Sequence, residues 1–124
     1  MNQDEMDEFD LLEMGSYDNH GLFEVQYVFK DEKRSARALK SLYTKRLIEF
    51  FWQPPDIKQE EVPLNAEESE KLIQRFSDQS IFSNEGLKNG FYTFLNTDLG
   101  DDYIRNSEKF QHYIKTEWAK KYVR

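Results

Sequence analysis

The segment KRSARALKSLYTKRLIEFFWQPP, residues 33–55, joins a block of positive charge to an aromatic end. Laid out at 100° per residue, its apolar side chains form one stripe. The stripe consists of Ala36, Leu39, Tyr43, Leu47 and Phe50. Proline lacks the backbone N–H and restricts the residue before it, so Pro54 and Pro55 end a helix. The segment therefore predicts one long helix over residues 31–52.

The charge of the chain changes sign in blocks. Residues 1–32 carry a net charge of −9, residues 33–46 carry +6, residues 47–70 carry −6 and residues 71–124 carry +2. The formal total of −7 repels nucleic-acid phosphates at long range and suits a protein partner with a basic surface. The basic block is the exception that the fold has to explain.

Four further segments have recognisable patterns. Residues 22–29, LFEVQYVF, are rich in β-branched and aromatic residues and alternate in polarity, which predicts a β-strand. Asn65, with Glu68 three residues later, has the spacing of a capping box and predicts the start of a short helix. Residues 87–95 have helical spacing weakened by glycine. A final helix is expected from about Asp101, with acidic residues at its start.

These elements predict a small α+β domain that is mostly α, with at most a short N-terminal β-strand or hairpin. Aromatic residues make up 15% of the chain, enough to fill a core with few side chains. Residues 1–14, MNQDEMDEFDLLEM, are expected to form either a short amphipathic helix or a disordered acidic arm. Residues 15–124 are expected to form a single globular domain.

Several classes of site are disfavoured by composition and spacing. The chain has no cysteine, which excludes disulfides and thiolate metal sites, and its two histidines have no metal-binding spacing. No nucleophile elbow and no phosphate-binding glycine cluster occurs. We therefore expect no enzyme activity, no cofactor and no metal. No apolar run is long enough to span a bilayer, so the sequence predicts no membrane association and a cytoplasmic location.

Two apolar residues fall on the polar side of the predicted long helix. Ile48 and Trp52 lie there with Arg37 and Lys45, and leaving an indole in water forfeits about 2–3 kcal/mol of burial energy. Three coverings compete: the acidic segments of the chain itself, a protein partner, or nucleic acid. Trp and Arg are enriched at interface hot spots, which favours Trp52 as an anchor with Arg37 and Lys45 around it.

The sequence is best interpreted as a small acidic protein that binds another macromolecule, as a protein inhibitor or immunity-like regulator from a bacterium or phage. The expected protein-binding residues are Asp4, Glu5, Asp7, Glu8, Phe9, Asp10, Arg37, Lys45, Ile48 and Trp52. One alternative is a nucleic-acid-associated regulator that contacts phosphates through Arg34, Arg37, Lys40, Lys45 and Arg46. Another is an acidic mimic of nucleic acid.

Overall fold

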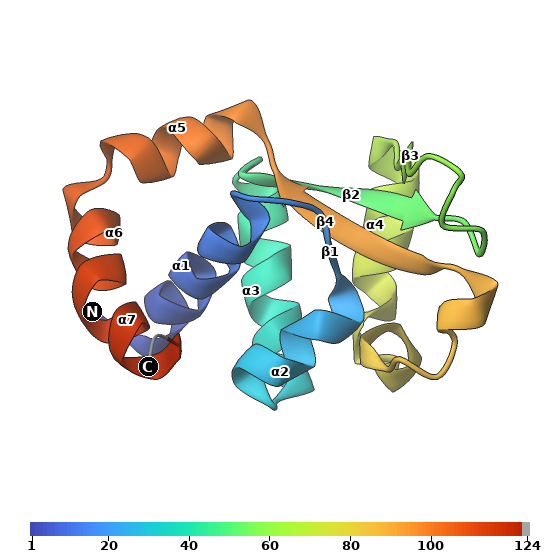
Figure 1. Ribbon diagram of the computed structural model, residues 1–124, viewed down its shortest axis with the longest axis horizontal. Coiled ribbons are helices and arrows are strands. Elements are labelled where there is room, and N and C mark those ends of the chain that lie inside the picture. Colours follow the sequence, from blue (N-terminus) through green and yellow to red (C-terminus); the bar gives the residue numbers. More distant parts are fainter. Residues whose placement is uncertain (123–124) are drawn as a thin grey trace.

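A four-stranded antiparallel sheet with the order β1-β4-β2-β3 lies at the centre of the computed structural model, which describes residues 1–122 (Figure 1). The strands are β1 (His20–Gly21), β2 (Ile48–Gln53), β3 (Val62–Pro63) and β4 (Phe91–Asn96). The long pair is β2 and β4, whose register runs from Ile48 opposite Asn96 to Gln53 opposite Phe91.

Helices make up most of the fold. They are α1 (Gln3–Gly15), α2 (Gln26–Phe29), α3 (Glu32–Thr44), α4 (Ala66–Gln74), α5 (Asp98–Asn106), α6 (Glu108–Tyr113) and α7 (Ala119–Tyr122). Shorter 3-10 turns occupy Leu22–Val25, Arg75–Ser77, Gln79–Phe82 and Leu87–Asn89, and a π-helical segment, Ile114–Trp118, joins α6 to α7. The predicted class, a small and mostly α α+β domain, is confirmed.

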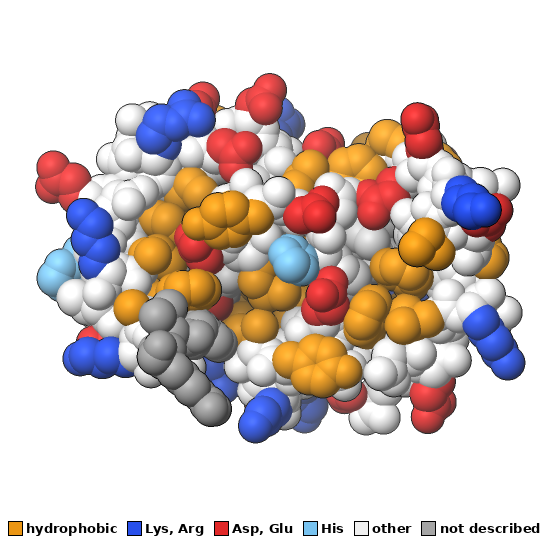
Figure 2. Space-filling model, in the orientation of Figure 1, with side chains coloured by type: hydrophobic (Ala, Val, Ile, Leu, Met, Phe, Trp, Pro, Cys, Tyr) orange, Lys and Arg blue, Asp and Glu red, His pale blue; other side chains and the backbone are white. Residues whose placement is uncertain are grey.

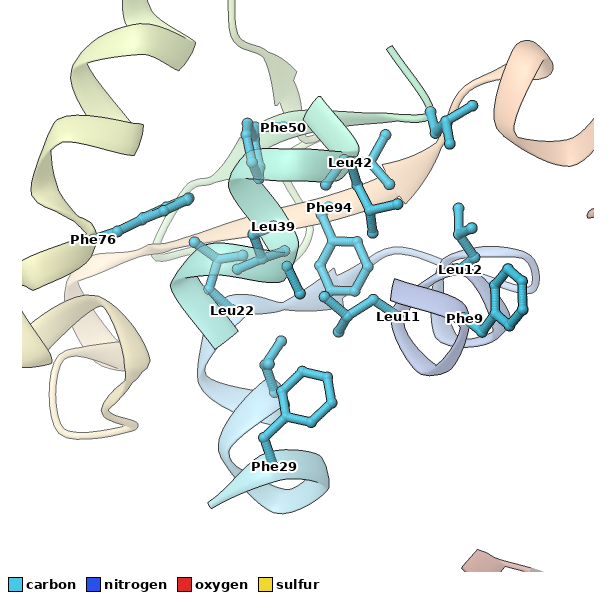
Figure 3. Close-up of a cluster of buried hydrophobic side chains, with 14 of the residues drawn as sticks. Phe9, Leu11, Leu12, Leu22, Phe29, Leu39, Leu42, Phe50, Phe76 and Phe94 are labelled. Carbon is cyan, nitrogen blue, oxygen red and sulfur yellow. The ribbon is translucent and has the colours of Figure 1, made fainter. Parts of the chain in front are cut away.

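The core lies between the sheet and the helices α1 and α3, which run beside each other (Figure 1). Leu11 of α1 and Leu39 of α3 project toward Phe94 of the central strand β4 (Figure 3). Residues 3–15 therefore take the helical alternative that the sequence left open. They belong to the same core as the rest of the chain, because Phe9 and Leu12 are also buried in it.

The predicted long helix is wrong in its second half. Helix α3 ends at Thr44, and residues 48–53 form β2. Arg46 adopts a left-handed conformation with φ 64°. The N–H of Leu47 donates to the carbonyl of Leu42, and the N–H of Arg46 donates to the carbonyl of Tyr43. These two bonds form a Schellman motif, which ends the helix with an arginine where glycine is usual.

Replacing Arg46 with glycine should stabilise the protein. Because a side chain is strained at positive φ, the Arg46→Gly variant should raise the free energy of unfolding by about 1 kcal/mol. Urea denaturation followed by tryptophan fluorescence measures this change. Arg46→Gln removes the same charge but keeps the strain, so it should bring no gain, and equal effects of the two variants would contradict the conformational explanation.

The predicted strand at residues 22–29 is also wrong. This segment forms a 3-10 turn and then α2. The buried residues are Leu22, Val25 and Phe29, which have helical spacing, whereas the alternating residue Tyr27 is 63% exposed. The Glu24 carboxylate accepts the N–H of Gly21 at 2.7 Å and caps the turn.

Residues 91–96 form the central strand β4 rather than a helix. Gly90 has φ 96°, and a side chain there would collide with the Trp52 ring and the Gln53 carbonyl. The aromatic residues that follow pair with β2, about 40 positions earlier in the chain. No local pattern reveals such a pairing.

Of the two predicted helix beginnings, the one at Asn65 is confirmed and the one at about Asp101 is not. Asn65 and Glu68 form the predicted capping box, and α4 begins at Ala66. The last helix instead begins at Asp98 and breaks at Ser107, whose hydroxyl accepts the N–H of Phe110 and starts α6.

Helix α5 lies very close to the turn that follows α3. The Thr97 hydroxyl donates to the Arg46 carbonyl at 2.7 Å, and the Thr97 N–H donates to the Leu47 carbonyl at 3.0 Å. A Cβ on Gly100 would lie 2.1 Å from the same Leu47 carbonyl oxygen. This contact fixes α5 over the ends of α1 and α3 (Figure 1).

Candidate functional site

The acidic helix α1 pairs with the basic helix α3. Asp7 accepts two hydrogen bonds from Arg34, from Nε at 3.0 Å and from Nη2 at 2.7 Å. Asp7 is only 1% exposed, and the bond to it raises the pKa of the Arg34 guanidinium. One turn along α3, Arg37 lies 3.4 Å from Asp4 in an exposed pair. Together with Lys45, whose partner is Glu8, three of the six cations in residues 33–46 thus pair with carboxylates of α1.

Glu8 joins the C-terminal end of α3 to α1. Its Oε1 accepts the Lys45 ammonium at 2.7 Å and the Ser41 hydroxyl at 2.9 Å. Of the residues proposed to contact phosphates, Lys40 and Arg46 form no ion pair with the residues that the structure describes. The other three cations, Arg34, Arg37 and Lys45, are paired, so only these two of the five could bind an anionic ligand without breaking an ion pair that the structure describes.

Asp10 is buried next to the C-terminal helices. The Tyr113 hydroxyl donates to its Oδ1 at 2.5 Å, and the Lys121 ammonium lies 3.7 Å from its Oδ2. Burial raises the pKa of the Asp10 carboxyl, with the Asp7 charge acting in the same direction and the bonds to Tyr113 and Lys121 opposing. Two expected protein-binding residues, Asp7 and Asp10, are therefore buried inside the fold and have no free surface for a partner.

The raised pKa of Asp10 predicts a pH effect on stability. The folded state holds the Asp10 proton more tightly than the unfolded state, so this group favours folding at low pH. That contribution is lost as the pH rises through the folded-state pKa. The free energy of unfolding of the wild type, minus that of Asp10→Asn, should rise as the pH is lowered from about 7 to about 4. Urea denaturation at several pH values tests this, and a constant difference would contradict it.

A hollow of about 360 Å³ lies where α1, the end of α3 and α5 meet. We call it the α1–α5 hollow; its lining residues are Asn2, Asp4, Glu5, Glu8, Phe9, Leu12, Leu42, Lys45, Leu47 and Tyr103. Phe9, Leu12 and Leu42 are buried and form an apolar floor. The carboxylates lie around it, with Glu5 also 2.5 Å from the Lys109 ammonium, and Tyr103 remains 43% exposed.

The hollow brings together half of the expected protein-binding residues, namely Asp4, Glu5, Glu8, Phe9 and Lys45. Arg37 lies beside it through its pair with Asp4. Ile48 is a buried core residue on β2.

Trp52 does not lie on the basic helix as expected. It is on β2, half-buried, with its ring 4.8 Å from that of Tyr92 on β4. It lines a second cavity, whose residues include neither Arg37 nor Lys45. The expectation of an anchor surrounded by those two cations is therefore wrong, because residues 48–53 form a strand rather than the last turns of the predicted helix.

Known proteins do not identify the site. The chain matches no protein-family model, no curated protein and no solved structure. None of the helices within residues 1–122 has the length and apolar character to cross a membrane. The same residues contain no cluster of three or more His, Asp or Glu side chains suited to holding a metal ion. Function is therefore inferred from the geometry of the two cavities.

Sequence reasoning missed Tyr103 and Leu47 at the α1–α5 hollow, and Tyr92 and Arg75 at the second cavity. Tyr103 falls within the single final helix that the sequence predicts from about Asp101. The break at Ser107 puts it on a separate helix whose direction differs, and the Ser107 cap followed by Glu108 was the available signal.

Proposed function

We propose that the protein acts by binding a partner protein with a basic surface at the α1–α5 hollow, as an inhibitor or immunity-like regulator. The observation that carries the proposal is an apolar floor surrounded by carboxylates, with the exposed ring of Tyr103 beside it. Interfaces are typically apolar at the centre and polar at the rim, and tyrosine is enriched among their energetic hot spots.

The partner expected here presents an apolar side chain flanked by Lys or Arg. The apolar group would enter the hollow, and the cations would approach Asp4 and Glu5 at its rim. Charge complementarity of this kind accelerates association and weakens as salt increases. The proposed setting is the cytoplasm, since a chain without cysteine suits a reducing compartment.

The two nucleic-acid alternatives have less support. Arg34, Arg37 and Lys45 each have a carboxylate partner on α1, so contact with phosphates would require breaking those pairs. For a nucleic-acid mimic, the acids of α1 would have to face outward, but Asp7 and Asp10 are buried.

Affinity capture with the purified protein tests the proposal. A specific partner should be retained at about 0.1 M salt and released near 1 M, where the Debye length falls from about 10 Å to about 3 Å. Tyr103→Ala combined with Asp4→Lys should lower the affinity at least tenfold. The matched control is Tyr27→Ala, an exposed tyrosine on α2 outside the hollow, which should bind as the wild type does.

Binding of the captured partner would then be measured directly with both purified proteins. An affinity that is equal for the wild type and the Tyr103 variant would overturn the assignment to this hollow. Failure to retain any protein at low salt would overturn the proposed binding function.

A further inference from the structure

The second cavity lies at the end of the sheet, where β2 ends and β4 begins. Its volume is about 180 Å³, and its lining residues are Phe23, Trp52, Arg75, Ser80, Ile81, Ser83, Gly86, Leu87, Gly90, Phe91 and Tyr92. Figure 2 shows hydrophobic side chains gathered around the start of β4, on the right of the view. We call this the aromatic cavity. It shares no residue with the α1–α5 hollow.

Aromatic rings form its walls. Trp52 and Tyr92 are a cross-strand pair with ring centroids 4.8 Å apart, and Phe23 and Phe91 meet edge to face at 5.5 Å. Gly90 lets the chain pass directly against the indole, since a Cβ there would lie 2.4 Å from the Trp52 ring. Walls of this kind favour a flat aromatic guest, because aromatic pairs gain energy beyond the area that they bury.

Size limits the guest to about one ring with a short substituent. An engineered apolar cavity of about 150 Å³ in another protein binds benzene. The aromatic cavity is slightly larger, at about 180 Å³. A nucleotide or a multi-ring compound would extend outside it.

Arg75 supplies the cavity with positive charge. Its guanidinium lies 5.9 Å from the centroid of the Tyr92 ring, and its Nη2 is 3.5 Å from the Asp78 carboxylate. Both members of this pair are about half exposed, and the distance is long for a charge-assisted hydrogen bond. The backbone N–H of Ser80 donates to Oδ1 of Asp78 at 3.0 Å, and this bond lowers the pKa of the Asp78 carboxyl. Arg75 therefore keeps donors for a second carboxylate.

We propose that the aromatic cavity binds a small aromatic carboxylate, with the ring against Trp52 and Tyr92 and the carboxylate on Arg75. Two sources share this chemistry: a free aromatic acid, and the C-terminal aromatic residue of a peptide. The proposal is independent of the partner-binding function at the α1–α5 hollow.

Four probes test whether binding requires the carboxylate of the ligand, and whether the ligand is a free acid or a peptide C-terminus. Phenylacetate represents the free acid and N-acetyl-L-phenylalanine the peptide C-terminus, while phenylacetamide and N-acetyl-L-phenylalaninamide are their neutral counterparts. Binding is followed by the fluorescence of Trp52 in a Trp118→Phe background, which leaves one tryptophan. Aromatic NMR shifts of the wild-type protein provide a second measurement that does not depend on that substitution.

We expect saturable binding of phenylacetate, with at least tenfold weaker binding of its amide and at least tenfold loss in Arg75→Gln. The matched control is Arg105→Gln, because Arg105 also pairs with an aspartate three residues away and is exposed, but lies outside the cavity. That variant, and Tyr103→Ala, should bind as the wild type does. Binding of N-acetyl-L-phenylalanine as well would identify a peptide C-terminus as a source, and its exclusion would identify the free acid.

Three results would overturn the proposal. The first is the absence of saturable binding of either acid up to a concentration of about 10 mM, which is above the dissociation constant expected for a small ligand of this size. The second is equal affinity for the acids and their amides, and the third is equal affinity of the wild type and Arg75→Gln for the acids, since either would remove the role of the carboxylate.

Discussion

Replacing Arg34 with alanine should lower the free energy of unfolding by about 2–3 kcal/mol, since the buried Asp7 carboxylate loses two charge-assisted hydrogen bonds from a partly exposed partner. Asp7 is 1% exposed and accepts two bonds from Arg34. After the substitution its remaining side-chain donor is Gln3, at 2.7 Å. Chemical denaturation followed by circular dichroism measures the loss.

Arg37→Ala provides a matched control. Arg37 lies on the same helix and also pairs with an acid of α1, but Arg37 and Asp4 are 62% and 60% exposed. Exposed pairs contribute about 0–1 kcal/mol, so this variant should be nearly as stable as the wild type. Adding Asp7→Asn to Arg34→Ala removes the unpaired buried charge and should recover part of the lost free energy of unfolding. Equal losses in Arg34→Ala and Arg37→Ala would show that burial of Asp7 is not the cause.

The blocks of charge anticipated part of this arrangement. Opposite net charges on residues 1–32 and 33–46 indicated that an acidic segment of the chain was one of three possible covers for the basic helix. Ion pairs from α1 to Arg34, Arg37 and Lys45 provide that cover. The start of α4 was also predictable from the local sequence, because the two capping-box residues, Asn65 and Glu68, are only three positions apart.

The sheet was the part that local patterns did not predict. The sequence does not signal the end of α3, because an arginine, Arg46, rather than a glycine adopts the left-handed conformation there. Without that signal, the sequence predicts that the aromatic-rich residues 48–52 continue the helix. The pairing of β2 with β4 is set by contacts between distant residues, and tertiary contacts of this kind override local propensity. Both cavities depend on it, since Trp52, Tyr92 and Leu47 take their places from the sheet or the turn before it.

Helix α1 was ambiguous in the sequence because its acids and its apolar residues are buried together. Asp7, Asp10 and Glu13 are buried along with Phe9, Leu11 and Leu12. No face is purely apolar, so helical periodicity could not separate a packed helix from an acidic arm. Specific partners on other elements, Arg34 and Tyr113, make this burial of carboxylates tolerable.

Replacing Phe9 with alanine should therefore destabilise the fold by about 3–5 kcal/mol, as expected for loss of a buried phenylalanine. The Phe9 ring is 2% exposed and lies 5.2 Å from the ring of Phe110 and 5.7 Å from that of Tyr113. Urea denaturation measures the change, and Tyr103→Ala, at the exposed side of the same hollow, should cost about 1 kcal/mol or less.

The comparison of these two variants separates packing from recognition. Phe9→Ala should lose stability and partner binding together, whereas Tyr103→Ala should lose binding while it remains folded. A Phe9→Ala variant within about 1 kcal/mol of the wild type would show that α1 is not part of the core. The apolar floor of the α1–α5 hollow would then not be preformed, and the basis for placing a partner there would be removed.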